Sequence, residues 1–261
     1  MSRIDASAEL LKLGHQLGVP ASRLEFLAGV PADDLRVLRS QIGEVLFRAD
    51  RRHFGKIVAV SKIMPTAVAA KLAEHVLSPL IAARTAELLE PPRAVDMVMH
   101  LSPRYVADVS VAMDPRRAPD ILAQTPPGRV AEVAAELAAR GEWVVIGAFV
   151  SAVSPEALGA SIPALDGEQW LRVGFVLEDL SRLDSIVATL TDAQVDALLT
   201  AAGGKDLWSE LDELVLTVDA ANSARLAARF AVADDATVHA VGNAVSTGAL
   251  SRAAAERLAS R

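Results

Sequence analysis

The residues best placed to do chemistry are Lys71, Glu74 and His75, which lie close together in a segment with helical patterning. In a helix, Lys71 and His75 share a face because residues four apart are neighbours. An amine, a carboxylate and an imidazole could together move a proton. The same residues could equally face a protein partner, and no second group converges on them in sequence. We therefore assign Lys71, Glu74 and His75 to a candidate polar groove and predict no catalytic residue.

A second pair of carboxylates, Glu178 and Asp179, interrupts an otherwise apolar segment between Arg172 and Arg182. An ion pair with these arginines is the simplest interpretation, since charged groups in apolar surroundings are normally paired. The other interpretation is that the carboxylates line a groove that binds a ligand. Glu178 and Asp179 therefore join the candidate polar groove.

Arginines recur where successive helices are expected to begin, at Arg104, Arg116 and Arg117. A cation in the first turn is mildly unfavourable beside the positive end of the helix dipole. An anionic partner along that edge would explain the recurrence, and so would simple solubility. We predict that Arg104, Arg116 and Arg117 bind a partner.

Known catalytic and metal-binding motifs do not occur in the sequence. Gly203-Gly204-Lys205 lacks the strand and the first glycine of a phosphate-binding loop, and no HExxH, GxSxG or EF-hand pattern is present. The 5 histidines are scattered singly, whereas metal sites need clustered ligands. We expect no metal and no cofactor, and we favour a non-enzymatic role while leaving an enzyme open.

Composition narrows the class of protein further. The net charge of −7 argues against a nucleic-acid partner, which needs a basic surface. The absence of cysteine (a count of 0) is compatible with a reducing cytoplasm, where we expect the chain to act. The first residues carry Asp5 and Glu9 and do not resemble a signal peptide. The uncharged run 143–155 is too short to cross a bilayer, so we predict no membrane span.

Prolines organise the middle of the chain, at Pro92, Pro103, Pro115 and Pro127. Proline fits the first turn of a helix but not its interior. This spacing therefore predicts a stack of helices about two turns long, with breaks near Pro65 and at 78–79. No convincing strand pattern occurs, and the segment 144–147 is the one ambiguous place. The prediction is an all-α fold.

Three regions are expected along the chain: an N-terminal helical segment over 1–56, a short-helix repeat region over 57–200 and C-terminal capping helices over 201–261. The first should contain helices over 3–17, 22–29 and 31–48, the second of them opened by a capping box at Ser22 and Glu25. Further caps are expected near 154, 166, 181 and 191. Runs that are apolar on every helical face predict an interior that includes Trp143, Ile146, Phe149, Val173, Phe175, Val176 and Leu177.

The proline units share a second regularity. Asp108, Asp120 and Glu132 lie five residues after their prolines, and Val109, Ile121 and Val133 follow them directly. Over residues 90–200 this pattern resembles the N-terminal domain of MgtE-type magnesium transporters and the helical repeats of the flagellar motor-switch protein FliG. The resemblance implies an irregular right-handed superhelix of short proline-capped helices. The acid-rich helix starts of the transporter domain are replaced here by PPR, SPR and DPR, so the resemblance carries over no metal ligand.

A stack of helices offers an extended surface on which another protein can dock. We therefore predict a cytoplasmic, non-enzymatic adaptor that binds a protein partner and that could also form a homo-oligomer. The alternative is a carrier or enzyme for a hydrophobic small molecule, of lipid or isoprenoid type, held between the helices. The high apolar content of 52% and the methionines at Met97, Met99 and Met113 support this alternative.

Overall fold

The fold is built from helices alone in the part of the chain that the computed structural model describes, residues 3–48, 54, 57–59, 63–177 and 179–260. Helix makes up 78% of the structure, which confirms the all-α prediction. The segment 144–147, which was ambiguous in sequence, belongs to a helix. The chain forms two compact units, Met1–Ser161 and Ile162–Arg261.

The first unit contains a series of short helices after two longer ones at its N-terminus. Their bounds are α1 Arg3–Leu17, α2 Ala32–Arg48, α4 Thr66–Val76, α5 Pro79–Ala86, α6 Pro91–His100, α7 Pro103–Ala112, α8 Pro119–Gln124, α9 Pro127–Ala139, α10 Trp143–Val150 and α11 Pro155–Ser161, with 3-10 turns η1 Ala21–Leu27 and η2 Pro115–Arg117.

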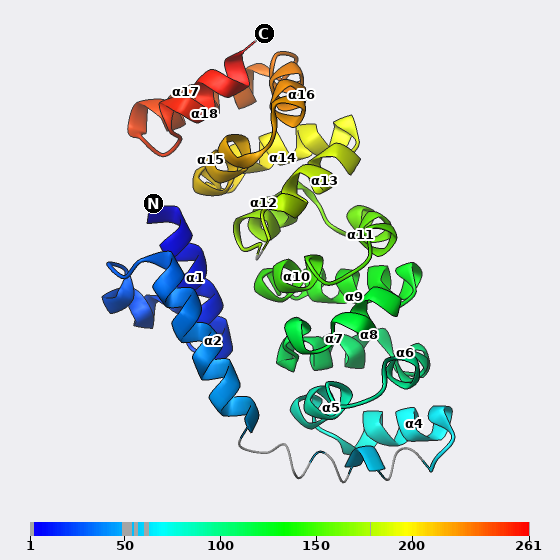
Figure 1. Cartoon of the computed structure of the whole chain (residues 1–261). Helices are drawn as coiled ribbons and strands as arrows, with labels where there is room; N and C mark the ends of the chain where they lie inside the picture. The colour runs from blue at the N-terminus through cyan, green and yellow to red at the C-terminus, as the bar shows by residue number, and fades with distance from the viewer. Residues whose placement is uncertain (1–2, 49–53, 55–56, 60–62, 178, 261) are drawn as a thin grey trace. The chain divides into compact units, whose positions relative to one another are not determined.

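Proline begins most of the short helices, as the spacing predicts. Pro79, Pro103, Pro127 and Pro155 are each the first residue of a helix, where the missing N–H has no partner to lose. Many of these helices pack on the helix two further along: α4 contacts α6, α5 contacts α7, α7 contacts α9 and α9 contacts α11 (Figure 1). The right-handed superhelical path expected for this region stays a prediction.

The two N-terminal helices form a hairpin with a core of its own. Its buried residues are Ala6, Leu10, Leu13, Leu24 and Leu35. Beside this core the buried carboxylate of Glu9, 1% exposed, accepts hydrogen bonds at 3.0 Å from both Lys12 and Arg39. Burial acts to raise the pKa of Glu9, but these two cations outweigh it and hold the pKa below its ordinary value. The hairpin is therefore stabilised by a buried charge cluster as well as by apolar packing.

The second unit continues the pattern of short capped helices. Their bounds are η3 Ile162–Ala164, α12 Gly167–Phe175, α13 Ser181–Thr189, α14 Asp192–Gly204, α15 Trp208–Thr217, α16 Ala220–Phe230, α17 Asp235–Thr247 and α18 Arg252–Ala259. Asp166 and Thr191 form complete capping boxes, which confirms two of the expected caps. Helix α12 packs on α14 so closely that a Cβ on Gly167 would lie 2.5 Å from the Ala197 backbone.

Two of the expected caps are wrong. Ser22 and Glu25 do not cap a helix, because η1 begins at Ala21 directly after Pro20, with no side-chain cap. Ser181 does not cap α13 either. Its own N–H and hydroxyl donate to Asp179, and Asp184 instead accepts from the Asp219 N–H.

The expected interior is confirmed for its aliphatic members and wrong for its aromatic ones. Ile146, Val173, Val176 and Leu177 are buried. Trp143, Phe149 and Phe175 are only half-buried. These aromatic residues lie at or next to helix ends, where fewer neighbouring helices surround a side chain.

Candidate functional site

Helix α4 presents an apolar surface to solvent. It packs on α6, and its buried residues are Ala69, Ala70 and Ala73. Val68, Leu72 and Val76, spaced at i, i+4 and i+8, are exposed to 52%, 50% and 68%. We call these three residues the apolar stripe. Single exposed apolar residues are ordinary, whereas a contiguous row of them marks an interaction surface.

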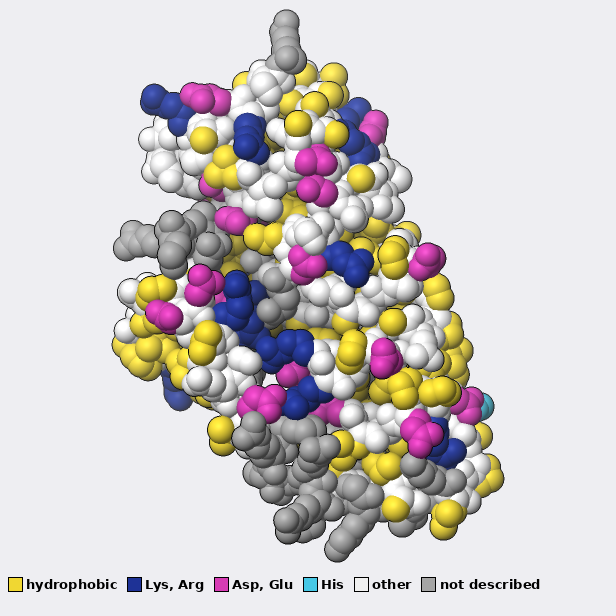
Figure 2. All heavy atoms as spheres, in the orientation of Figure 1, with side chains coloured by type: hydrophobic (Ala, Val, Ile, Leu, Met, Phe, Trp, Pro, Cys, Tyr) yellow, Lys and Arg dark blue, Asp and Glu magenta, His cyan; other side chains and the backbone are white. Residues whose placement is uncertain are grey.

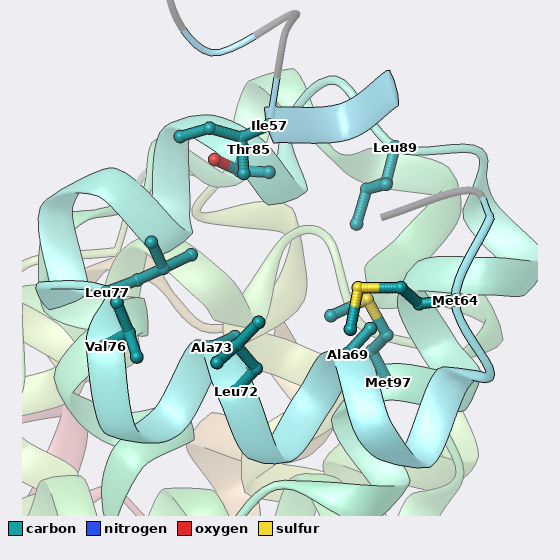
Figure 3. A pocket seen from close by; sticks show the side chains of 10 residues that line it. All are labelled: Ile57, Met64, Ala69, Leu72, Ala73, Val76, Leu77, Thr85, Leu89 and Met97. Atoms are coloured by element: carbon teal, nitrogen blue, oxygen red, sulfur yellow. The ribbon is translucent and has the colours of Figure 1, made fainter. Parts of the chain in front are cut away.

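A cavity of about 310 Å³ lies beside the apolar stripe (Figure 3). It is lined by Ile57, Met64, Ala69, Leu72, Ala73, Val76, Leu77, Thr85, Leu89 and Met97. Leu72 and Val76 belong both to this lining and to the apolar stripe, so the cavity adjoins the exposed surface. The hydroxyl of Thr85 donates to the Ile81 carbonyl oxygen at 2.7 Å and is thereby committed to its own helix.

The candidate polar residues of α4 divide between two sides of the helix. Lys71 and His75 are exposed on the same side as the apolar stripe. His75 Nδ1 lies 2.7 Å from the Lys71 carbonyl oxygen. Glu74 is half-buried and accepts a hydrogen bond from the hydroxyl of Ser102, the N-cap of α7. The predicted trio therefore does not converge: the carboxylate joins α4 to α7, and the two basic groups face solvent.

Tyr105 strengthens the same joint. Its hydroxyl lies 3.0 Å from the carbonyl oxygens of both Ala73 and Leu77, at the end of α4. Burial, together with the nearby Glu74 carboxylate, raises the pKa of this hydroxyl. The phenol therefore stays protonated and holds the C-terminal end of α4 in place.

The predicted partner-binding arginines differ in their surroundings. Arg104 is exposed on α7. Arg116 donates to both carboxylate oxygens of Asp114 at 2.9 Å, and Arg117 donates to Glu44 of α2 at 2.7 Å. Arg116 and Arg117 thus form ion pairs within the first unit. Figure 2 shows the wider pattern, in which basic side chains alternate with acidic ones on the face it presents.

A buried carboxylate completes this charged cluster. Glu87 accepts from Arg84 at 2.9 Å and from the Asp114 N–H at 3.2 Å. Burial raises the pKa of Glu87, although Arg84 opposes the shift. Asp114 shows the opposite balance, because the hydrogen bonds and charge of Arg116 outweigh its burial and lower its pKa. These interactions fix the turn between α7 and α8.

The two remaining candidate carboxylates are Glu178 and Asp179. Asp179 is exposed and accepts from the Ser181 N–H at 3.0 Å and from its hydroxyl at 2.6 Å. These hydrogen bonds lower the pKa of Asp179 and fix the first turn of α13. Glu178 lies outside the described residues. Asp179 therefore acts as a local turn residue.

Sequence reasoning missed a set of arginines that donate to main-chain carbonyls of other helices. Arg129 donates to the carbonyl oxygens of Val98 and Leu101, at the C-terminal end of α6. Arg225 and Arg257 do the same at the ends of α13 and α15. A cation is favourable there, because the carbonyls at a helix C-terminus are unpaired and carry negative charge. Of these three arginines only Arg129 had a local signal, its place two residues after the pair Pro126–Pro127, whereas no proline lies near Arg225 or Arg257.

Neither a metal centre nor a membrane span emerges from the described residues. They contain no group of three or more His, Cys, Asp or Glu side chains that could hold a metal ion. Among them, no helix is both long and apolar enough to cross a bilayer.

No protein-family model, curated protein or solved structure matches the chain. The resemblance to MgtE-type and FliG helices stays a prediction.

Proposed function

We propose that this protein is a non-enzymatic adaptor that binds a protein partner through helix α4. The apolar stripe of Val68, Leu72 and Val76, next to an apolar cavity, is the observation that carries the proposal. Interfaces concentrate their binding energy where apolar side chains meet in a desolvated pocket. The proposal places the protein in the cytoplasm, with which its lack of cysteine is compatible.

The polar side chains near the stripe support binding over catalysis. Proton transfer within the candidate trio would need Lys71, Glu74 and His75 to lie within hydrogen-bond reach of one another. Glu74 is bound to Ser102, and His75 Nδ1 lies against a backbone carbonyl of its own helix. The carboxylate and the imidazole are thus directed to different sides of α4.

The second candidate function is a carrier of a hydrophobic small molecule, and the cavity favours it. A volume of about 310 Å³ lies at the lower end of the range typical of small-molecule sites, about 300–1,000 Å³. Such sites normally add a few polar groups that fix the orientation of the ligand. Among the described lining residues, Thr85 has the only polar side-chain group, and its hydroxyl is already bonded, so an aliphatic chain is the ligand that fits best.

Site-specific photo-crosslinking in the native cell tests the two functions together. A photoreactive phenylalanine derivative in place of Leu72 should trap a protein partner, whereas the same group in place of Val238, an exposed valine of α17, should not. Native mass spectrometry of the purified protein should show the mass of the chain without an added lipid.

The carrier function predicts the opposite pattern. A retained lipid-like mass that disappears when Ala73 in the cavity wall is replaced by Phe would support the carrier. The absence of any crosslinked protein at Leu72 would then remove the adaptor proposal. A crosslink of equal yield at Leu72 and Val238 would show that the stripe has no special role.

A further inference from the structure

One side of helix α4 combines exposed apolar residues with a lysine and a histidine. Val68, Lys71, Leu72, His75 and Val76 are all exposed, and their spacing of i, i+3, i+4, i+7 and i+8 places them on one side of the helix. We call these five residues the α4 face. It combines the apolar stripe with two basic groups, although the chain as a whole has a net charge of −7.

The basic groups of the α4 face are not neutralised by the carboxylate nearest in sequence. Glu74 turns away from them and accepts from Ser102. Within the described ranges, no carboxylate forms an ion pair with Lys71. Glu87, a further carboxylate of the neighbouring α5–α6 region, is paired with Arg84. The α4 face therefore offers basic charge to whatever docks there.

We propose that the partner contributes an amphipathic helix with acidic flanks and one bulky apolar anchor, and this inference rests on the proposed function. Helices that dock in this way present apolar residues at i, i+3 or i+4 and i+7, about the same length of helix as the i, i+4, i+8 spacing of the apolar stripe. The anchor side chain enters the cavity between Leu72 and Val76. Acidic residues beside it lie against Lys71 and His75, which gives the docking helix its direction and selects against basic helices.

Other occupants fit the α4 face less well. A second copy docked symmetrically would bring Lys71 of both chains to one interface, where like charges repel. An anionic membrane gains only about 1 kcal/mol for each cation near its surface, and it would repel the acidic remainder of the chain. An acidic protein helix uses both features of the α4 face at once.

Selection from a displayed library of helical peptides tests the partner chemistry directly. Peptides that are retained by the wild-type protein should share an apolar i, i+4 pattern and should be enriched in Asp and Glu at the flanking positions. Wild type and two variants, Leu72→Asp and a Lys71→Glu/His75→Glu double variant, serve as parallel baits. Circular dichroism and urea unfolding establish that all three are folded, as expected for substitutions at exposed positions.

Each bait has its own expected result. Leu72→Asp should weaken the best peptide by at least about thirtyfold in fluorescence anisotropy, as for the loss of a central apolar contact. The Lys71→Glu/His75→Glu variant should weaken it by roughly tenfold, since each exposed ion pair contributes little. That variant should also retain peptides whose flanks are basic. This reversal identifies charge pairing, which mere structural damage could not produce.

Several outcomes would overturn the inference. The selected peptides could lack an acidic bias, or Leu72→Asp could retain the same peptides as wild type. The protein could sediment with phosphatidylcholine–phosphatidylserine vesicles, or it could form a dimer that Leu72→Asp dissociates. The crosslinking experiment separates this failure from failure of the proposed function. A protein trapped at Leu72 through a segment that lacks acidic residues would leave the adaptor in place and remove only the acidic helix.

Discussion

The guanidinium of Arg129 is expected to be a main support of the helix stack in the first unit. This side chain is 8% exposed and reaches from α9 to the end of α6. Its Nε donates to the Val98 carbonyl oxygen at 3.1 Å, and its Nη2 donates to that of Leu101. The substitution Arg129→Met keeps an apolar side chain of similar length and removes both donors.

The magnitude follows from what each lost contact contributes. A hydrogen bond from a charged donor is worth about 1.5–3 kcal/mol. The third contact, to Glu132, involves a carboxylate that is 58% exposed and adds little. Val98 and Leu101 are themselves only half-buried, so water can reach their carbonyls in part and the lower end of the range applies. We expect Arg129→Met to destabilise the α6–α9 region by about 3 kcal/mol.

Native-state hydrogen exchange measures this loss where it occurs. A destabilisation of about 3 kcal/mol corresponds to roughly a hundredfold faster exchange of the α6 and α9 amides. The matched control is Arg104→Met in α7, whose side chain is exposed. Its effect should stay within about 0.5 kcal/mol.

The reasoning would be refuted by a change of less than about threefold in the exchange of α6 amides in Arg129→Met. It would equally be refuted by an effect of Arg104→Met as large as that of Arg129→Met. Either result would mean that arginine contacts with helix ends do not hold the stack together.

Two further predictions concern burial and close packing. Glu9→Gln should lower the free energy of unfolding by about 3–5 kcal/mol, because Lys12 and Arg39 lose the buried carboxylate between them. The pKa of Glu9 is lowered in the folded state, so its contribution to the free energy of unfolding is present above the ordinary pKa of 4.5 and is lost as the pH falls through the folded pKa. Urea midpoints measured against pH should show this acid dependence in wild type and less of it in Glu9→Gln. Gly167→Ala should lower the free energy of unfolding by about 1–3 kcal/mol in thermal unfolding, because the new Cβ would meet the α14 backbone at 2.5 Å. The control Gly128→Ala should be neutral or slightly stabilising, because a Cβ at that position meets nothing within 4 Å. Equal effects of the two glycine substitutions would contradict the close approach of α12 and α14.

Local sequence signals predicted most of the helices because those signals act within a few residues. Proline in the first turn and the capping boxes at Asp166 and Thr191 fix helix starts without help from distant parts of the chain. The helix cap predicted at Ser181 was wrong because the Ser181 hydroxyl donates to Asp179, two residues before it. This local turn competes with the expected cap. Local rules thus determined where helices begin, and local competition explains the exception.

The sequence alone determined that this protein is a chain of short helices, whereas the tertiary structure decided which side chains remain available for binding. Lys71, Glu74 and His75 look like one group in the sequence. Contact with Ser102 of α7, 28 residues further along, turns Glu74 inward and leaves the two basic groups with the apolar stripe. Arg129 and Arg104 differ in the same way: the Arg129 guanidinium donates to carbonyls of a distant helix, whereas Arg104 is exposed. Helix starts depend on neighbours in sequence, but the exposure and pairing of a side chain depend on helices that pack from elsewhere in the chain.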